Sequence, residues 1–371
     1  MLKDVKEAEE LSYKYDIPKE DVILISLNAS GLNSDLPYKR VRFKLRLYSQ
    51  PQEVFYFGIP IIRNTPFYLK NNGLFLETQK VGDCLEVEND TCDATYFRRN
   101  DTVLVLNSNS RSSCSGCAFC ATYRQDATDK FTLDSEEKLE KCIKDLFTLP
   151  EKYNSTRPHF HRPLSVSTSI SNLYQISIVT GCFGSEEKAS EHIKTVAQYF
   201  CKNGFNGELL YIGSELVSKK ELASIKERVP NFALIFSLEC FTRRNELLKN
   251  IKSRVTLEDI ENVFNYCKEL GISRSFTYIV GLEPIEEIVK GFKRFLHLID
   301  RFPIIQIFQP HWEEQKKLRV LDAENIEYYI KVRKEIEKMF ITTSLRPRSW
   351  ENYRGLWYFT FGNEKLGGIR I

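Results

Sequence analysis

The chain is 371 residues long, with 42% hydrophobic residues, 28% charged residues and a formal net charge of +3. A chain of this length holds one large domain or two to three smaller ones. Its composition is that of an ordinary globular protein and excludes disordered, collagen-like and rod-like coiled-coil classes. The near-neutral charge gives no general reason to expect binding to nucleic acid or to an anionic membrane.

The sequence predicts no membrane-spanning or secretory segment. It has no stretch of about 18 uncharged apolar residues, so we expect no transmembrane helix and no membrane partner. The stretch from Met1 to Asp16 is rich in Lys and Glu and lacks the apolar region of a secretory signal. Ten cysteines without such a signal indicate a reducing compartment. We therefore expect a cytoplasmic protein.

Residues 1–100 predict an N-terminal helix followed by a small β domain. Residues 1–20 carry apolar side chains at helical spacing. Residues 21–100 contain short β-like runs, and Asn71-Asn72-Gly73 between two of them is typical of a hairpin. The expected strands are 41–49, 53–62, 66–70, 73–81 and 84–88.

Residues 101–315 alternate between apolar runs and amphipathic helical patterns. This alternation predicts an α/β fold with a parallel sheet, and its six units are fewer than the eight of a closed barrel. Ser135 and Ser185 are expected helix N-caps, and Gly271 is expected just after a helix end. The expected strands are 102–107, 174–179, 209–213, 233–239, 274–281 and 304–309. The expected helices between them are 135–147, 185–200, 218–229, 256–271 and 285–299.

Residues 316–371 form the expected C-terminal extension, with a helix at 322–340 and an aromatic-rich tail. In the tail, aromatic side chains interleave with arginines. This pattern can stack bases and grip phosphates, or it can pack over the barrel as core. We favour packing.

Three cysteines, Cys114, Cys117 and Cys120, lie close together in a loop directly after the first strand of the βα series. Functional groups in parallel α/β folds sit on loops at the carboxyl ends of strands. A structural zinc site needs four ligands, and the ferredoxin pattern needs a fourth cysteine where this chain has Arg124. Three thiolates on an iron–sulfur cube would leave one iron open for a chelating ligand.

This loop resembles the cluster loop of the radical SAM superfamily, over roughly residues 101–315. Phe119 matches the aromatic residue that precedes the last cysteine in that family. The spacing here is C-x2-C-x2-C, one residue shorter than the usual C-x3-C-x2-C. The resemblance implies a partial (β/α)6 TIM-like barrel, with a 4Fe-4S cluster on the three cysteines and S-adenosyl-L-methionine (SAM) as cofactors.

The resemblance also implies SAM-binding groups at strand ends. Thr180 and Gly181 stand where the family carries a motif that approaches the methionine amino group. Ser237 and Glu239 are two residues apart on a strand, so they share a face and are expected near the ribose and the methionyl moiety.

Two further SAM contacts are implied by position. Arg243 or Arg244 is expected to pair with the SAM carboxylate. Gly281 belongs to an apolar, glycine-containing stretch that is expected along the adenine. For the arginines and for Gly281, a purely structural role is an open alternative.

The activity implied by the resemblance is reductive cleavage of SAM to a 5′-deoxyadenosyl radical, which abstracts hydrogen from a small-molecule or peptide substrate. Natural-product or cofactor biosynthesis is the expected setting, and the protein is expected to be oxygen-sensitive. An external electron donor of the flavodoxin or ferredoxin type is implied. A radical has to be kept from water, so residues 21–100 and the tail are candidate covers.

Several polar residues lie in or just after the expected strands and are candidates for the cavity wall. Each also has a structural alternative, as do the His159–His161 pair and the strand-end cysteines Cys182 and Cys240. The candidates are Gln175, Ser177, Ser214, Glu215, Thr277, Gln306, Gln309, His311 and Trp312.

Two other functions stay open. One is a radical SAM enzyme that modifies RNA, which the balanced charge of the N-terminal region disfavours. The other is a non-enzymatic binding protein stabilised by zinc or a cluster, with a distant fourth ligand such as Cys92.

Overall fold

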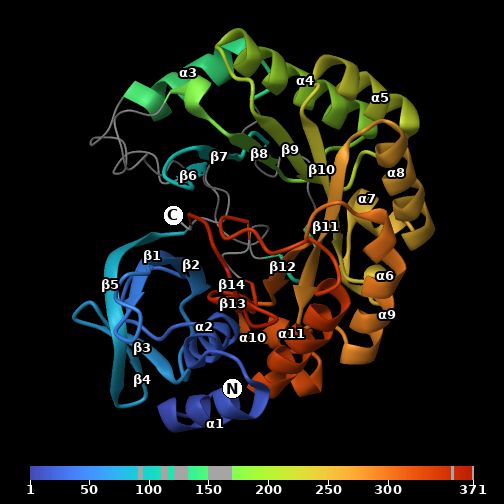
Figure 1. The fold of residues 1–371 in the computed structure, drawn as a ribbon. Helices are drawn as coiled ribbons and strands as arrows, with labels where there is room; N and C mark the ends of the chain where they lie inside the picture. Colours follow the sequence, from blue (N-terminus) through green and yellow to red (C-terminus); the bar gives the residue numbers. More distant parts are fainter. Residues whose placement is uncertain (91–94, 110–115, 121–132, 149–168, 352–354, 370–371) are drawn as a thin grey trace.

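The fold contains two main sheets, which lie side by side in Figure 1. The computed structural model describes residues 1–90, 95–109, 116–120, 133–148, 169–351 and 355–369. One continuous hydrophobic core runs from Leu2 through both sheets to Phe361. Within the described ranges, no helix is long and apolar enough to cross a membrane.

The N-terminal part has two helices, α1 (Val5–Tyr15) and α2 (Lys19–Ser30), and a five-stranded antiparallel sheet in the order β2-β1-β5-β4-β3. The hairpin at Asn71 and Asn72 is confirmed, with φ angles of 48° and 60°. The strands are β1 (Arg40–Leu47), β2 (Phe55–Pro60), β3 (Phe67–Lys70), β4 (Gly73–Leu76) and β5 (Gln79–Asn89).

One expectation for this part is wrong, and one helix was not expected. The run 73–81 is two strands, because Glu77 takes a left-handed φ of 50° and turns the chain. Residues 19–30 form a helix that the sequence did not reveal. Its residues Val22 to Ala29 are all buried, so it lacks the polar face that marks an amphipathic helix.

The second sheet has the order β12-β11-β10-β9-β8-β7-β6, in which β7 to β12 are parallel and the edge strand β6 (Tyr96–Arg98) is antiparallel. The expected partial barrel is therefore confirmed. The parallel strands are β7 (Val103–Leu106), β8 (Gln175–Val179), β9 (Glu208–Gly213), β10 (Phe232–Glu239), β11 (Ser273–Val280) and β12 (Ile304–Ile307).

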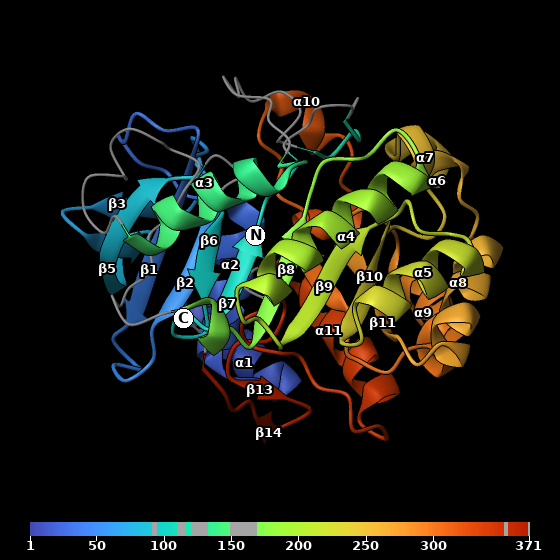
Figure 2. The same ribbon diagram turned by 90° about the horizontal axis from the view of Figure 1, so that it is seen from above.

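Helices cover the outer face of this curled sheet, and Figure 2 shows α4, α5 and α8 side by side along it. Ser185 caps α4 by accepting a hydrogen bond from Lys188 N, and Gly271 follows α8 with a φ of 63°. Both expected helix ends are thus confirmed. The helices are α3 (Glu136–Thr148), α4 (Glu186–Lys202), α5 (Lys219–Arg228), α6 (Arg244–Leu247), α7 (Asn250–Arg254), α8 (Leu257–Glu269) and α9 (Ile285–Phe295).

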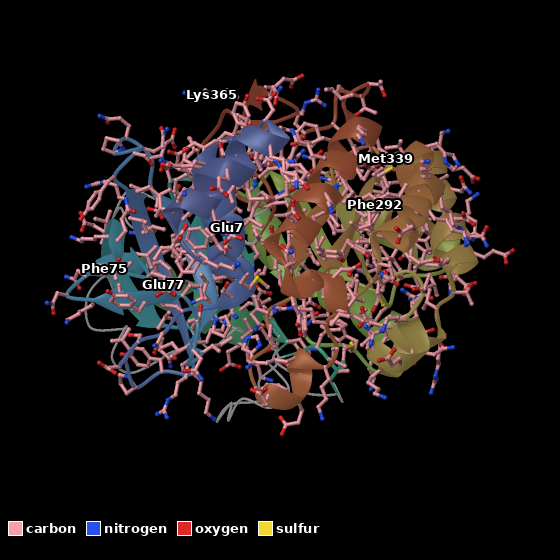
Figure 3. All side chains as sticks on the ribbon, turned by 90° about the horizontal axis from the view of Figure 1, so that it is seen from below. Glu7, Phe75, Glu77, Phe292, Met339 and Lys365 are labelled. Carbon is pink, nitrogen blue, oxygen red and sulfur yellow. The ribbon has the colours of Figure 1, made fainter. Side chains whose placement is uncertain are left out.

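The C-terminal part packs against α2 in the N-terminal part and against α9 of the barrel. It contains α10 (Glu313–Lys316), α11 (Ile326–Phe340) and the short strands β13 (Thr360–Phe361) and β14 (Glu364–Lys365). Figure 3 shows this side from below, with Glu7 on α1, Met339 on α11 and Lys365 on β14 labelled. The tail aromatics Trp357, Tyr358 and Phe361 are buried, so these rings serve as core.

Candidate functional site

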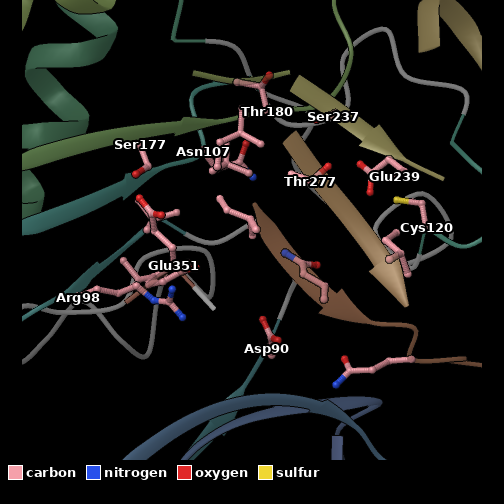
Figure 4. A pocket seen from close by; sticks show the side chains of 18 of the residues that line it. Asp90, Arg98, Asn107, Cys120, Ser177, Thr180, Ser237, Glu239, Thr277 and Glu351 are labelled. Carbon is pink, nitrogen blue, oxygen red and sulfur yellow. The ribbon is translucent and has the colours of Figure 1, made fainter. Parts of the chain in front are cut away.

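The interior of the half-barrel is a cavity of about 320 Å³. Its wall comes from the inward-facing residues of all six parallel strands, from the cysteine loop and from the N- and C-terminal parts. This volume lies at the lower end of the roughly 300–1,000 Å³ usual for ligand pockets. Figure 4 shows Cys120 and Glu239 together at one end of the cavity and Arg98 and Glu351 at the other.

The described part of the cysteine loop, residues 116–120, forms a fixed turn at the cavity wall. Cys120 N donates to Cys117 O at 2.9 Å, and Ala118 N donates to Leu247 O at 2.9 Å. Gln315 Nε2 donates to Ala118 O at 2.9 Å from α10. Phe119 and Cys120 line the cavity, as expected from their place after the first parallel strand.

The surroundings of this turn suit a metal cluster. Cys117, Ala118 and Phe119 pack against an apolar group of side chains that includes Leu247 and Phe308. Burial raises the pKa of the Cys117 thiol to about 11. A bound metal ion reverses this preference, because a coordinating thiol loses its proton outright. The apolar shell would then limit solvent access, which tunes such a centre.

Cys114 lies outside the described residues. Within those residues, no group of three or more His, Cys, Asp or Glu side chains is arranged to hold a metal ion. The described chain therefore supplies two of the three expected thiols.

The expected strand-end residues Thr180, Ser237 and Glu239 all line the cavity. Glu239 closes β10 with a left-handed φ of 70°, next to a register shift between β10 and β11. Such a conformation costs a non-glycine residue about 1–3 kcal/mol and is concentrated at functional sites. The Glu239 side chain lies at the end of the cavity that holds Cys120 (Figure 4).

Lys252, on α7, is a cavity residue that the sequence did not reveal. Its Nζ lies 3.0 Å from Glu239 Oε1, and both side chains are largely buried. Burial disfavours the charged amine, but the Glu239 carboxylate and the nearby Cys117 and Cys182 together outweigh burial and raise the pKa of Lys252 well above its ordinary value. A buried cation therefore lies beside the cysteine turn. It sits in a short helix between the expected elements, where no pattern marks it.

The structure does not bring Arg243 or Arg244 to the cavity. Arg243 donates to Leu282 O and Leu318 O and pairs with Glu246. The Arg244 guanidinium donates to four backbone carbonyls, those of Leu238, Cys240, Lys252 and Val255. These bonds fix the loop after β10 and leave neither guanidinium facing a ligand in the cavity.

Gly181 and Gly281 are also outside the cavity wall. Gly181 N donates to Asn109 O at 2.8 Å, which joins two strand-end loops. Gly281 has a φ of 112°, and a Cβ there would come within 3.2 Å of the Tyr329 hydroxyl. The positive φ favours glycine at 281, and the close approach adds to that preference.

The polar candidates divide into two groups. Ser214, Glu215 and Trp312 are not among the lining residues, and Glu215 instead accepts hydrogen bonds from Phe183 N and the Tyr211 hydroxyl. His159 and His161 fall outside the described residues, and Cys182 and Cys240 are buried. The candidates that do line the cavity are Gln175, Ser177, Thr277, Gln306, Gln309 and His311.

The N-terminal sheet closes the side that the missing barrel strands leave open, between β6 and β12 (Figure 1). Arg40 on β1 pairs with Asp90 at 2.6 Å and donates to Gln309 Oε1 at 2.8 Å, just beyond β12. Arg42, two residues on, lies over the ring of Tyr96 on β6. Strand β1 thus spans the opening of the barrel. Sequence patterns cannot reveal such a contact between two sheets.

Comparison with known proteins gives weak structural similarity. No family model matches the sequence, and no curated protein matches it. Streptococcus suis SuiB bound to S-adenosylmethionine matches at 13% identity and a TM-score of 0.38, over 63% of this chain and 48% of that protein. The radical S-adenosylmethionine methyltransferase TsrM from Kitasatospora setae, with cobalamin and a 4Fe-4S cluster bound, matches at 12% identity and a TM-score of 0.36. The match covers 55% of this chain and 36% of that protein.

Coproporphyrinogen III oxidase (HemN) from Escherichia coli, a radical SAM enzyme, matches at 14% identity and a TM-score of 0.40, over 62% of this chain and 50% of that protein. The chain thus spans half or less of the length of each of these proteins. TsrM and HemN belong to the superfamily that the cysteine loop resembles. Because all three TM-scores are below 0.5, the function is judged from the site.

Proposed function

We propose that this protein is a radical SAM enzyme that binds a 4Fe-4S cluster through Cys114, Cys117 and Cys120. The observation that carries the proposal is the placement of Phe119 and Cys120 at the wall of the barrel cavity, beside the ends of β8 and β10. A zinc staple that only stabilised the fold would have no need of an enclosed cavity lined by polar strand-end groups.

When bound, the cluster supplies one electron that splits SAM into methionine and a 5′-deoxyadenosyl radical, which takes a hydrogen atom from the substrate. The chain's own residues bind SAM and the substrate and enclose them. Lys252 is the cation that we assign to the SAM carboxylate, in place of Arg243 or Arg244. Thr180, Ser237 and Glu239 offer hydroxyl and carboxylate oxygens to the SAM amino group and ribose. The N-terminal sheet and residues 350 and 351 complete the cavity wall, which would shield a radical from water.

The reaction after SAM cleavage is proposed only by class: hydrogen abstraction from a small molecule or peptide, with a flavodoxin or ferredoxin as electron donor. The enclosed cavity supports a substrate, or a segment of one, that enters the barrel. It gives no support to a folded RNA as the reacting group.

The test is SAM cleavage by protein purified and iron-reconstituted without oxygen, with dithionite as reductant. We expect 5′-deoxyadenosine from the wild type and none from Cys117→Ala. Cys201→Ala is the matched control, because Cys201 is exposed on α4, away from the cavity. A protein that holds stoichiometric zinc, takes up no iron and cleaves no SAM would refute the proposal.

A further inference from the structure

One polar side chain in the cavity wall is buried without a hydrogen-bond partner. Thr277 on β11 lines the cavity and is 6% exposed, and its Oγ1 makes no hydrogen bond within the part of the chain that the structure describes. Burying a hydroxyl without a partner costs free energy, so a ligand that brings a partner into the cavity is favoured. In the view of Figure 4, Thr277 lies between Ser177 and Cys120.

The same strand carries a hydroxyl that the fold itself uses. Ser275 lies two residues before Thr277 and therefore on the same face of β11. It is 0% exposed, and its Oγ donates to Arg301 O at 2.9 Å. Ser275 is not among the residues that line the cavity. The unpartnered hydroxyl of this strand is thus the one that belongs to the cavity wall.

Gln306 on β12 adds an amide to the same part of the wall. It lines the cavity and is half-buried, and its side-chain amide makes no hydrogen bond to a described residue. In the register of the two strands, Thr277 stands opposite Ile304 and Gln306 stands opposite Ile279. Because residues two apart share a strand face, Thr277 and Gln306 are diagonal neighbours on the inward face.

The surroundings of this pair favour an uncharged ligand group. Ile279 and Ile304 are 8% and 4% exposed, and Ile212 of β9 also lines the cavity. An ionised group would lose its hydration here and would find no opposite charge on Thr277 or Gln306. A carboxylate also only accepts hydrogen bonds, whereas the Gln306 amide both donates and accepts. An amide in the ligand matches it, since an amide donates from N–H and accepts at its oxygen.

We infer that Thr277 and Gln306 form a binding subsite for an uncharged amide group of the substrate, either a peptide bond or a primary carboxamide. The inference rests on the proposed function, because it specifies the chemistry of the molecule that the radical would attack. Strands β11 and β12 carry none of the residues assigned above to SAM or to the cluster. Binding at this subsite requires no cluster chemistry, so it is tested separately from SAM cleavage.

The experiment measures equilibrium binding of three small probes to the iron-reconstituted full chain by titration calorimetry, with and without SAM. Cyclohexanecarboxamide carries a primary carboxamide, and its N-methyl derivative carries the equivalent of a peptide bond. Cyclohexyl methyl ketone keeps the carbonyl oxygen and lacks the N–H. We expect at least one amide to bind about fivefold more tightly than the ketone, whether or not SAM is present. The tighter amide identifies which of the two groups the subsite takes.

Variants locate the subsite. In Thr277→Val and in Gln306→Met, the preference for the amide over the ketone is expected to fall below about twofold. Ser275→Ala is the matched control and is expected to keep the preference, because the Ser275 hydroxyl is bonded to Arg301.

Thermal unfolding separates ligand binding from a structural role. Thr277→Val is expected not to lower the unfolding temperature, because it removes a hydroxyl that has no partner in the fold. Ser275→Ala breaks a buried hydrogen bond and is expected to lower that temperature by about 1–2 °C.

Equal binding of the amides and the ketone by the wild type, or no binding of either amide, would overturn the inference. So would an unchanged amide preference in folded Thr277→Val and Gln306→Met. Weaker SAM binding in these two variants would assign the pair to SAM and would overturn the inference as well. Absence of SAM cleavage in a wild type that still prefers the amide would instead count against the proposed function alone.

Discussion

At the scale of single residues, the Glu239–Lys252 pair belongs both to the barrel framework and to the candidate site. Glu239 holds a left-handed backbone conformation at the end of β10, and its carboxylate fixes the Lys252 amine at 3.0 Å. A strained residue persists only where its surroundings determine it. Here the surroundings are the buried amine and the cavity wall, so the pair is positioned before any ligand arrives.

We predict that Lys252→Gln weakens SAM binding by about tenfold or more, because the SAM carboxylate loses its buried cation. Equilibrium dialysis with SAM measures the dissociation constant. Lys219→Gln is the control, since Lys219 is exposed and pairs with Glu269 at the surface. If both variants bind SAM like the wild type, Lys252 serves only to neutralise Glu239.

His192 provides a prediction about pH. Its Nε2 lies 2.6 Å from Ser108 Oγ at the start of the cysteine loop, and both side chains are buried. Burial lowers the pKa of His192 from 6.5 to about 4, although nearby Asp134 acts in the other direction. The unfolded chain therefore binds more protons between about pH 4 and 6.5. This contribution to stability is complete above pH 6.5 and is lost as the pH falls.

Between pH 7.5 and 5.5, this one group is expected to lower the free energy of unfolding by about 1.4 kcal/mol. The measurement is urea denaturation of the wild type and of His192→Gln at both pH values. The glutamine keeps a hydrogen-bonding group near Ser108 and does not titrate. An identical pH dependence in the two proteins would show that His192 is not the group involved.

The sequence allowed the place of a residue to be predicted where the parallel sheet itself fixes that place. Phe119, Cys120, Thr180, Ser237 and Glu239 reach one cavity because carboxyl ends of parallel strands meet at one edge. Lys252, Arg42 and Arg98 were missed. They come from a short helix, from another sheet and from an antiparallel edge strand, and only tertiary packing brings them to the wall.

At the scale of elements, two neighbouring βα pairs repeat one local design. After β8, Phe183 N donates to Glu215 at 3.1 Å, and after β10, Phe241 N donates to Glu283 at 2.9 Å. Each glutamate follows the next strand and also accepts a bond from a buried tyrosine of that strand, Tyr211 or Tyr278. A carboxylate thus ties each strand-end loop to the strand beside it.

We predict that Glu283→Gln lowers the free energy of unfolding by about 2–4 kcal/mol, because hydrogen bonds to a buried carboxylate are charge-assisted. The Thr242 backbone also donates to this carboxylate, so an amide group leaves donors facing its NH2. Denaturant midpoints are to be compared with those of Glu261→Gln, which removes a half-buried partner of the exposed Arg294 and is expected to cost less than about 1 kcal/mol. Similar losses in the two variants would contradict the role given to Glu283.

The elements of the barrel were predictable because each combines a short apolar run with an amphipathic helix of ordinary length. Strand β10 begins at Phe232 and β11 at Ser273, each one residue before the expected start. Helix α2 was missed because it is buried on every side, and its mostly apolar run fits a buried helix and a buried strand equally. A Cys-Phe dipeptide follows both β8 and β10. It is the sequence feature that accompanies the glutamate arrangement at these two strand ends.

At the scale of the whole molecule, the two ends of the chain join around one buried ion pair. Asp21 on α2 lies 2.9 Å from Arg333 Nη1 on α11, and both residues are 0% exposed. Asp21 Oδ1 also accepts from Tyr358 N at 2.7 Å and from Phe359 N at 3.1 Å. Together with the bond from Arg40 to Gln309, this junction holds the N-terminal part against the barrel, so it supports the cavity from a distance.

We predict that Asp21→Asn lowers the free energy of unfolding by about 1.5–3 kcal/mol, because the buried Arg333 loses one of its two carboxylate partners and keeps only Glu337. Unfolding is expected to remain a single transition, since one hydrophobic core runs through both sheets. Chemical denaturation followed by circular dichroism and by tryptophan fluorescence measures both properties. Glu327→Gln is the control, because Glu327 joins the same ends of the chain through Lys14 at the surface and should cost less than about 1 kcal/mol. Two separate transitions in Asp21→Asn would mean that the N-terminal sheet detaches while the barrel stays folded, and the closed cavity would then depend on this single pair.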